Sequence, residues 1–244
     1  MPSFSQTILS RIEDRIVAAV ESGRVLGVSL AIVKGGDVAA AAFGKTSVEA
    51  DGVPVTPTTL FAIASISKVI LATLIMRLVE RGALDPDRPV VSYLPDFSFS
   101  DPERGSRVTL RHLLSHSSGL PAAGKNWGPC GRGALRDFVY EQVPHYGFIA
   151  DPGQVYEYSN TAICIAGHVA EAVTGDAYRD LVTEHVLDPL GMSRTTYDHA
   201  VAMTYRLALP HEEDDGTLQT VHRWPDNASG DPAGFAIAPV VDLA

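Results

Sequence analysis

The stretch FAIASISKVILATLIMRLVER, residues 61–81, decides the fold. Apolar residues recur at helical spacing from 64 to 81 and leave almost no polar side. This pattern predicts a helix that is buried all round in the middle of a domain. Ser65 and Lys68 interrupt the run, and a lysine in such a helix needs a partner or a task.

Ser65 and Lys68 are three residues apart, so a helix places the hydroxyl and the amine on one face. An amine that loses its proton in a dry pocket can take the proton of a serine hydroxyl. In the first turn of the helix, free N–H groups and the helix dipole would stabilise an oxyanion at Ser65. Ser67 is rotated away by about two helical steps and is predicted to be structural. With 18 serines and 4 lysines, random placement gives about 0.3 Ser-x-x-Lys matches, so the apolar context carries more weight than the match.

A second polar motif, Tyr158-Ser159-Asn160, opens an apolar helical pattern that runs to Val173. Near a lysine, the Tyr158 oxygen can act as a proton acceptor, and the Asn160 amide can orient the lysine or a substrate. Taken alone, the motif favours a helix cap at Ser159 or Asn160 with Tyr158 in the core.

The segment before the central helix has its own periodicity. Residues 8–20 show an amphipathic helical pattern that Gly23 closes. Two short apolar runs, 28–33 and 38–43, surround a Gly-Gly turn and predict a β-hairpin. A helix followed by a hairpin predicts an α+β protein with an antiparallel sheet.

The segments after the central helix are mostly helical. Four further helices are predicted, at 108–115, 134–143, 162–173 and 177–187. Residues 199–240 are predicted to be loops and short strands. The acidic cluster Glu212–Asp215 is predicted to be a solvated loop.

Composition excludes several kinds of partner. The net charge is −10 and there is no basic run, which predicts no nucleic-acid binding. No segment approaches the roughly 20 apolar residues of a membrane span, and no secretion signal is recognisable, so a cytoplasmic protein without membrane contact is expected. Cys130 and Cys164 give no disulfide framework, and a buried thiol is predicted for Cys164. No metal or other cofactor is expected, since no metal-ligand spacing stands out.

Histidines and aromatic residues offer alternatives for the site. His112 and His116 would allow a serine–histidine pair with Ser65. Trp127 and Tyr146 would fit a substrate pocket or the core equally well. Three further histidines lie in loop-like sequence and are predicted to be on the surface: His145, His211 and His222.

The chain resembles the β-lactamase-related serine hydrolases, which include class C β-lactamases, DD-peptidases, and esterases and acyltransferases of the β-lactamase fold. Five ordered segments carry the resemblance: 61–68, 110–120, 152–160, 188–196 and 232–244. Residues 61–68 resemble the nucleophile segment of the family, and residues 110–120 resemble its "LLSHTSGL" turn near the site. Five landmarks in order are much more specific than one motif.

The resemblance implies one β-lactamase/transpeptidase-like domain over 1–244, with an antiparallel sheet flanked by helices and an all-helical region. Residues 1–60 would give the N-terminal helix and hairpin, 61–198 the helical region with both motifs, and 199–244 loops and short strands. Ser65 would be the nucleophile, Lys68 and Tyr158 would share the proton transfers, and Asn160 would orient Lys68 and the substrate.

The sequence departs from the family pattern at the third motif. The family carries Lys-Thr-Gly or His-x-Gly on a strand beyond the segment that 242–244 matches, and this chain has no Lys-Thr-Gly. The C-terminal strands of the sheet are therefore expected to be absent, and the domain incomplete. A longer chain, a separate C-terminal fragment or a second copy would complete the sheet.

These features predict a serine hydrolase or acyltransferase that forms an acyl-enzyme on Ser65. Its substrate would be an ester, thioester or activated amide of a small molecule, as expected for a cytoplasmic enzyme. Two alternatives stay open. One is β-lactamase or D-amino-acid peptidase activity, and the other is a non-catalytic binding protein on the same fold.

Overall fold

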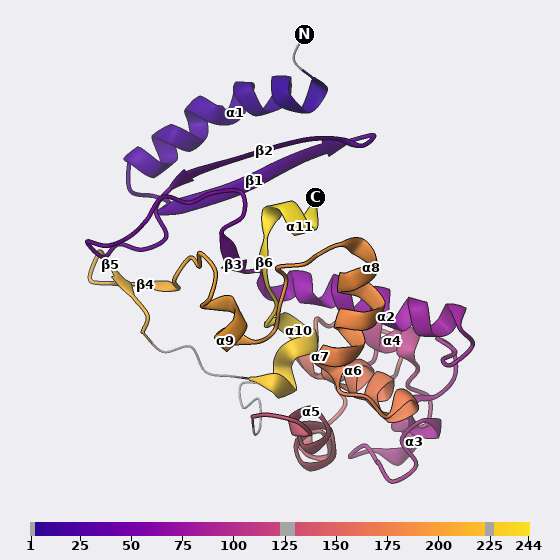
Figure 1. Cartoon of the computed structure of the whole chain (residues 1–244). Coiled ribbons are helices and arrows are strands. Elements are labelled where there is room, and N and C mark those ends of the chain that lie inside the picture. The colour runs from indigo at the N-terminus through magenta and orange to yellow at the C-terminus, as the bar shows by residue number, and fades with distance from the viewer. Residues whose placement is uncertain (1–2, 123–129, 223–226) are drawn as a thin grey trace. The chain divides into compact units, whose positions relative to one another are not determined.

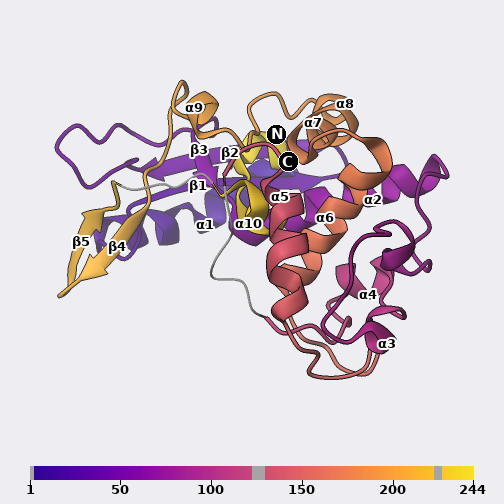
Figure 2. The same cartoon turned by 90° about the horizontal axis from the view of Figure 1, so that it is seen from below.

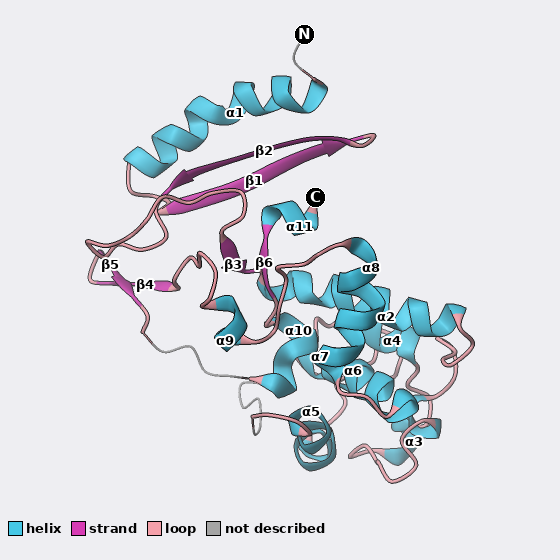
Figure 3. Ribbon diagram, in the orientation of Figure 1, coloured by secondary structure: helices cyan, strands magenta, loops and turns pink. Residues whose placement is uncertain are grey.

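The computed structural model describes residues 3–122, 130–222 and 227–244, which form two compact units (Figure 1). The first unit takes its described residues from 1–62, 191–225 and 237–244, and the second from 63–190 and 226–236. All strands of the described residues fall in the first unit, and the second is helical (Figure 3). That these parts make one domain stays a prediction.

The first unit begins with a helix laid on a hairpin. Its elements are α1 (Phe4–Glu21), β1 (Gly27–Lys34), β2 (Asp37–Gly44), β3 (Leu60–Ala62), α9 (His199–Ala202), β4 (His211–Asp214), β5 (Thr217–Thr220), β6 (Ile237–Pro239) and α11 (Val240–Leu243). β1 and β2 pair antiparallel, with Lys34 opposite Asp37. Gly35 and Gly36 form the turn with φ values of 56° and 83°, as a two-residue hairpin loop requires. The predicted helix and hairpin are confirmed.

The remaining strands form two more antiparallel pairs. β3 pairs with β6, and β4 pairs with β5. Leu60 of β3, Ile237 of β6 and Ala202 of α9 are fully buried and form a small core. The cluster Glu212–Asp215 is exposed, as predicted, but Glu212–Asp214 lie in β4 rather than in a loop. The three strand pairs of the described residues are therefore antiparallel, as the α+β prediction expects, and Leu60 of β3 also makes a single parallel bridge with Leu207.

The second unit is built around one buried helix. Its α-helices are α2 (Ser67–Glu80), α3 (Pro102–Gly105), α4 (Leu110–Leu114), α5 (Ala134–Asp137), α6 (Asn160–Thr174), α7 (Tyr178–Val182), α8 (Asp188–Leu190) and α10 (Asp231–Gly234). Residues 161–170 of α6 are all buried, and α2, α4, α5 and α10 pack around it (Figure 2). Gly175 ends α6 with a left-handed φ of 84°.

The prediction that α2 is buried all round is wrong. Leu71, Leu74 and Ile75 are fully buried against neighbouring helices. On the other side, however, Val69 is 65% exposed and Met76 49% exposed. A helix is buried on every side only where other elements cover every side, and here α6, α7 and α10 cover one.

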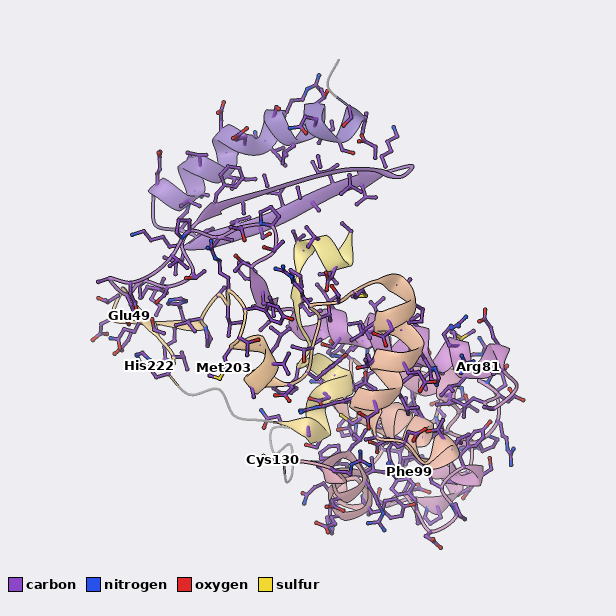
Figure 4. The ribbon with its side chains drawn as sticks, in the orientation of Figure 1. Glu49, Arg81, Phe99, Cys130, Met203 and His222 are labelled. Atoms are coloured by element: carbon purple, nitrogen blue, oxygen red, sulfur yellow. The ribbon has the colours of Figure 1, made fainter. Side chains whose placement is uncertain are left out.

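Two further findings bear on the expected partners. In the described ranges, no helix is both long and apolar enough to cross a membrane. The same residues contain no group of three or more His, Cys, Asp or Glu side chains placed to hold a metal ion. Cys130 is exposed (Figure 4), Cys164 is buried as predicted, and no disulfide joins the two. Trp127 lies outside the described residues.

Candidate active site

Ser65 lies in a 3-10 turn, Ala64–Ile66, directly before α2. Ala64 has a left-handed φ of 45°, which is uncommon for a residue with a side chain and is found at functional turns. The buried Ser67 fixes this turn: its hydroxyl donates to the Ala64 carbonyl at 2.7 Å and accepts the N–H of Ala236 at 3.0 Å. Ser67 is therefore structural, as predicted.

The Ser65 hydroxyl has two polar neighbours. Lys68 Nζ donates to Ser65 Oγ at 3.0 Å, and the Tyr158 hydroxyl lies 2.7 Å from the same oxygen. Lys68 Nζ is also 4.8 Å from the centre of the Tyr158 ring. Ser65 is exposed and Lys68 is half-buried, so a substrate can reach the hydroxyl while the amine is fixed beside it. The structure thus brings Tyr158 to a serine that lies 93 positions before it in sequence.

The surroundings of Tyr158 favour its ionised form. Burial by itself would raise the pKa of the phenol. The hydrogen bonds with Lys68 and Ser65, together with the positive charge of Lys68, outweigh burial and hold the pKa of Tyr158 below its ordinary value. A phenol of lowered pKa is a better proton acceptor near neutral pH than free tyrosine.

The backbone of Ser65 supplies one donor for an oxyanion. Ser65 is the second residue of the 3-10 turn Ala64–Ile66. Its N–H belongs to the first turn of the helical segment, where backbone donors have no partner inside the helix. It is therefore available to a substrate carbonyl oxygen.

The second partner of Lys68 is a backbone atom. Lys68 Nζ donates to the carbonyl oxygen of Ala233 in α10. The N–H of Ile63 binds the carbonyl of Ala236, so residues 233–236 hold both the lysine and the turn before Ser65. Sequence reasoning missed this role because a carbonyl group leaves no signature in residue type. The only signal was the Pro232-Ala233-Gly234 landmark.

α10 is fixed by a buried ion pair and by a close helix contact. Asp231 is 2% exposed and accepts a hydrogen bond from Arg179 Nε at 2.6 Å. Gly167 of α6 faces Pro232 so closely that an added Cβ would lie 2.5 Å from Pro232 Cγ. The position of the Ala233 carbonyl therefore depends on α6 and α7 as well as on α10.

Gly167→Ala is expected to destabilise the protein by about 1–3 kcal/mol, because the added methyl overlaps Pro232 in a packed interior. It is also expected to slow reactions at Ser65, since relief of the overlap moves α10 and the carbonyl that holds Lys68. Denaturant unfolding measures the first effect and labelling of Ser65 the second. An unchanged unfolding midpoint would contradict this prediction, because it would show that α10 moves away from the added methyl without loss of stability.

Ser159 and Asn160 have different surroundings. The Ser159 hydroxyl accepts the N–H of Ala162 at 3.1 Å and donates to the Pro121 carbonyl at 2.9 Å, so Ser159 is the N-cap of α6. Asn160 is the first residue of α6 and is half-buried. Among the described residues no hydrogen bond joins Asn160 to Lys68, and its orienting role stays a prediction.

The structure does not form a serine–histidine pair in the described residues. His112 forms a capping box with Thr109 at the start of α4. His116 contacts the Tyr158 ring rather than Ser65. His145 is exposed, and His222 lies on the surface 3.9 Å from Glu49 (Figure 4). His211 is half-buried instead and accepts the Val48 N–H at 3.2 Å.

Two other candidates for site chemistry lack the required setting. The tripeptide His145-Tyr146-Gly147 has a His-x-Gly pattern, but a 3-10 turn ends at His145 and no strand includes it. Cys164 lies in α6 within the electrostatic reach of Lys68. Burial raises the pKa of its thiol far above the ordinary value, so Cys164 is not a second nucleophile.

Several known proteins are similar to this chain in sequence or in fold. "Penicillin-binding protein 4" of Amycolatopsis lactamdurans is 33% identical over 207 residues, which are 84% of this chain and 53% of that protein. The octameric penicillin-binding protein homologue from Pyrococcus abyssi has a TM-score of 0.82 and 31% identity, over 97% of this chain and 55% of that one. The hydrolase EstCE1, described as having promiscuous acyltransferase activity, shares the fold alone. Its TM-score is 0.82 at 23% identity, over 98% of this chain and 71% of that one.

The chain spans about half the length of the curated relatives that it matches. Residues 12–244, which are nearly the whole chain, match the family described as Beta-lactamase. The family match, the fold and the relatives agree with the expected β-lactamase/transpeptidase-like architecture. This chain therefore belongs to the Beta-lactamase family.

Proposed function

We propose that the protein is a serine hydrolase or acyltransferase that forms an acyl-enzyme on Ser65. The observation that carries this proposal is the pair of contacts at Ser65 Oγ, 3.0 Å from Lys68 Nζ and 2.7 Å from the Tyr158 hydroxyl. An accessible serine hydroxyl with two proton-transfer groups is the arrangement that covalent catalysis requires.

In the first half-reaction, Ser65 Oγ attacks the carbonyl carbon of the substrate, and its proton passes to the Tyr158 oxygen. The new C–O bond pushes the carbonyl electron pair onto oxygen, where the Ser65 N–H stabilises it. When the intermediate collapses, the bond to the leaving group breaks. The leaving group takes the proton through Tyr158 and Lys68, and an ester on Ser65 remains.

In the second half-reaction, water or another hydroxyl or amine attacks the acyl-Ser65 ester. Tyr158 takes the proton of the attacking group, and a proton returns to Ser65 Oγ as the acyl group leaves. Water gives hydrolysis and another acceptor gives transfer. The orienting role of Asn160 belongs to this proposal, because its amide stands at the start of α6, two residues after Tyr158.

The proposed substrate is an ester, thioester or activated amide of a small molecule. The similarity in fold to EstCE1 supports this class. β-Lactamase or D-amino-acid peptidase activity is the second candidate, supported by the family match and by the relationship to penicillin-binding protein 4. The cytoplasmic location, and the completion of the sheet by a C-terminal part or a second copy, stay predictions.

The first test is labelling with a serine-reactive fluorophosphonate, followed by intact mass and peptide mapping. We expect one adduct, located on Ser65. Parallel assays with small esters, a cephalosporin and a peptide ending in D-alanine then separate the two substrate classes. The absence of an adduct would reject the enzyme and favour the non-catalytic alternative.

A further inference from the structure

Tyr158 lies in a segment that one residue, His116, holds by its backbone and its side chain. The N–H of Glu157 binds the carbonyl oxygen of His116 at 2.8 Å. The N–H of Ser159 binds His116 Nδ1 at 3.2 Å. The rings of His116 and Tyr158 are in contact and tilted to each other, with their centres 4.4 Å apart and their planes at 35°. His116 therefore contacts the ring of Tyr158 and binds the backbone of the residues on both sides of it.

The backbone of His116 makes this double contact possible. His116 has a left-handed φ of 57°, which few residues other than glycine adopt and for which histidine and asparagine are enriched. In this conformation the carbonyl oxygen and the ring of His116 both accept hydrogen bonds from the segment 157–159. A conformation of this kind costs about 1–3 kcal/mol and persists only where the surroundings require it.

The contact with Ser159 defines the protonation of the imidazole. An N–H donor points at Nδ1, so Nδ1 must accept and the ring must be neutral with its proton on Nε2. Burial, and after it the charge of Lys68, lower the pKa of His116 below its ordinary value, which keeps the ring neutral at neutral pH. Among the described residues, the ionisable groups that face the ring are Lys68 from α2 and the phenols of Tyr156 and Tyr158.

We infer that His116 is a positioning residue which, as a neutral imidazole, holds the Tyr158 hydroxyl at Ser65 Oγ and releases it on protonation. If Nδ1 of His116 were protonated, its N–H group would face the N–H group of Ser159, and the hydrogen bond between them would be lost. Protonation would also add a positive charge beside Lys68. The inference rests on the proposed function, because it explains how acid would switch off the same site.

Two substitutions test this role in the full chain. His116→Asn tolerates the left-handed backbone and places an amide oxygen where Nδ1 stands, but it does not titrate. His116→Ala removes both the acceptor and the ring. Tyr158→Phe, which keeps the ring that contacts His116 and lacks the hydroxyl, shows the labelling rate expected when the phenol oxygen is lost altogether.

The rate of fluorophosphonate labelling of Ser65 is measured against pH for each variant. In the unaltered protein the rate is expected to follow the ionisation of Tyr158 and to show a further fall in acid, at a pH below the ordinary histidine pKa of about 6.5, because the pKa of His116 is lowered. His116→Asn is expected to abolish this fall and to keep the rate at neutral pH within about threefold. His116→Ala is expected to slow labelling about 10- to 100-fold at every pH, because a misplaced catalytic group has that cost. An unchanged acid limb in His116→Asn would overturn the inference.

Nitrogen-15 NMR of the imidazole separates this inference from the proposed function. We expect the Nε2–H tautomer at neutral pH, and a phenol pKa for Tyr158 that rises in His116→Ala and stays low in His116→Asn. If no variant is labelled, the proposed function fails, but the tautomer and the Tyr158 titration still decide whether His116 holds the phenol. A proton on Nδ1 of His116 at neutral pH would refute the inference that His116 holds the phenol.

Discussion

Ser65→Ala is expected to abolish the fluorophosphonate adduct and to lower turnover of any ester substrate by about 10⁶-fold. The hydroxyl is the group of the proposed site that forms the acyl bond, and the exposed position of Ser65 leaves it open to a carbonyl compound. The N–H of residue 65 would remain in place, so binding of a substrate carbonyl would persist in part. Intact mass and initial rates measure the two effects.

Two other serines provide matched controls. Ser10→Ala removes an exposed hydroxyl of α1 that donates to the Gln6 carbonyl, far along the chain from the site, and labelling should not change. Ser67→Ala removes two buried hydrogen bonds that fix the turn before α2. It should lower stability by about 1–3 kcal/mol and slow labelling without abolishing it. An adduct that survives in Ser65→Ala and disappears in Ser67→Ala would exchange the roles of these two serines.

The elements that depend on residues close together in the chain could be predicted from the sequence. The two apolar runs and the Gly35-Gly36 turn predicted the β1–β2 hairpin, because only glycine accepts two successive positive φ angles without cost. Apolar periodicity and a terminal glycine predicted α6. The predicted helix 177–187 is divided instead into α7 and a π turn at Thr183–Leu187. Pro189 follows this turn, and a proline cannot donate the next helical hydrogen bond.

Features that depend on distant partners could not be predicted in this way. The apolar composition of α2 suggested burial all round, but periodicity does not tell how many sides other elements cover. The Ala233 carbonyl and the left-handed backbone of His116 are backbone properties. Both act through atoms or angles that every residue type shares, so a single sequence could not reveal them.

The candidate site was more predictable than the fold around it. Ser65 and Lys68 are separated by one helical turn, so their contact followed from spacing alone. Tyr158 is distant in sequence, and the resemblance to the family supplied it. The capping half of the alternative for the Tyr-Ser-Asn motif is confirmed, because Ser159 caps α6. Its other half is wrong: Tyr158 is not in the core but is 38% exposed, with its hydroxyl at Ser65 Oγ.

Lys68→Met is expected to slow labelling of Ser65 by about 10²–10⁴-fold, the contribution of a positioned proton-transfer group. Methionine keeps an unbranched chain of similar volume in the half-buried position, so the fold should persist. The hydrogen bonds to Ser65 and to the Ala233 carbonyl are lost, and with them the charge beside Tyr158. The pKa of the Tyr158 phenol should therefore rise, and the pH at which labelling reaches half its maximum should rise with it.

Two further lysine variants show which property of Lys68 matters. Lys34→Met alters an exposed lysine of the hairpin that lies over the Phe4 ring, and labelling should keep its rate. Lys68→Arg keeps a positive charge that does not leave the side chain near neutral pH. If Lys68 acts only by its charge, arginine should restore much of the rate and the low phenol pKa. If Lys68 itself accepts a proton during the reaction, Lys68→Arg should be as slow as Lys68→Met. A normal rate in Lys68→Met would leave Tyr158 as the sole proton acceptor for Ser65.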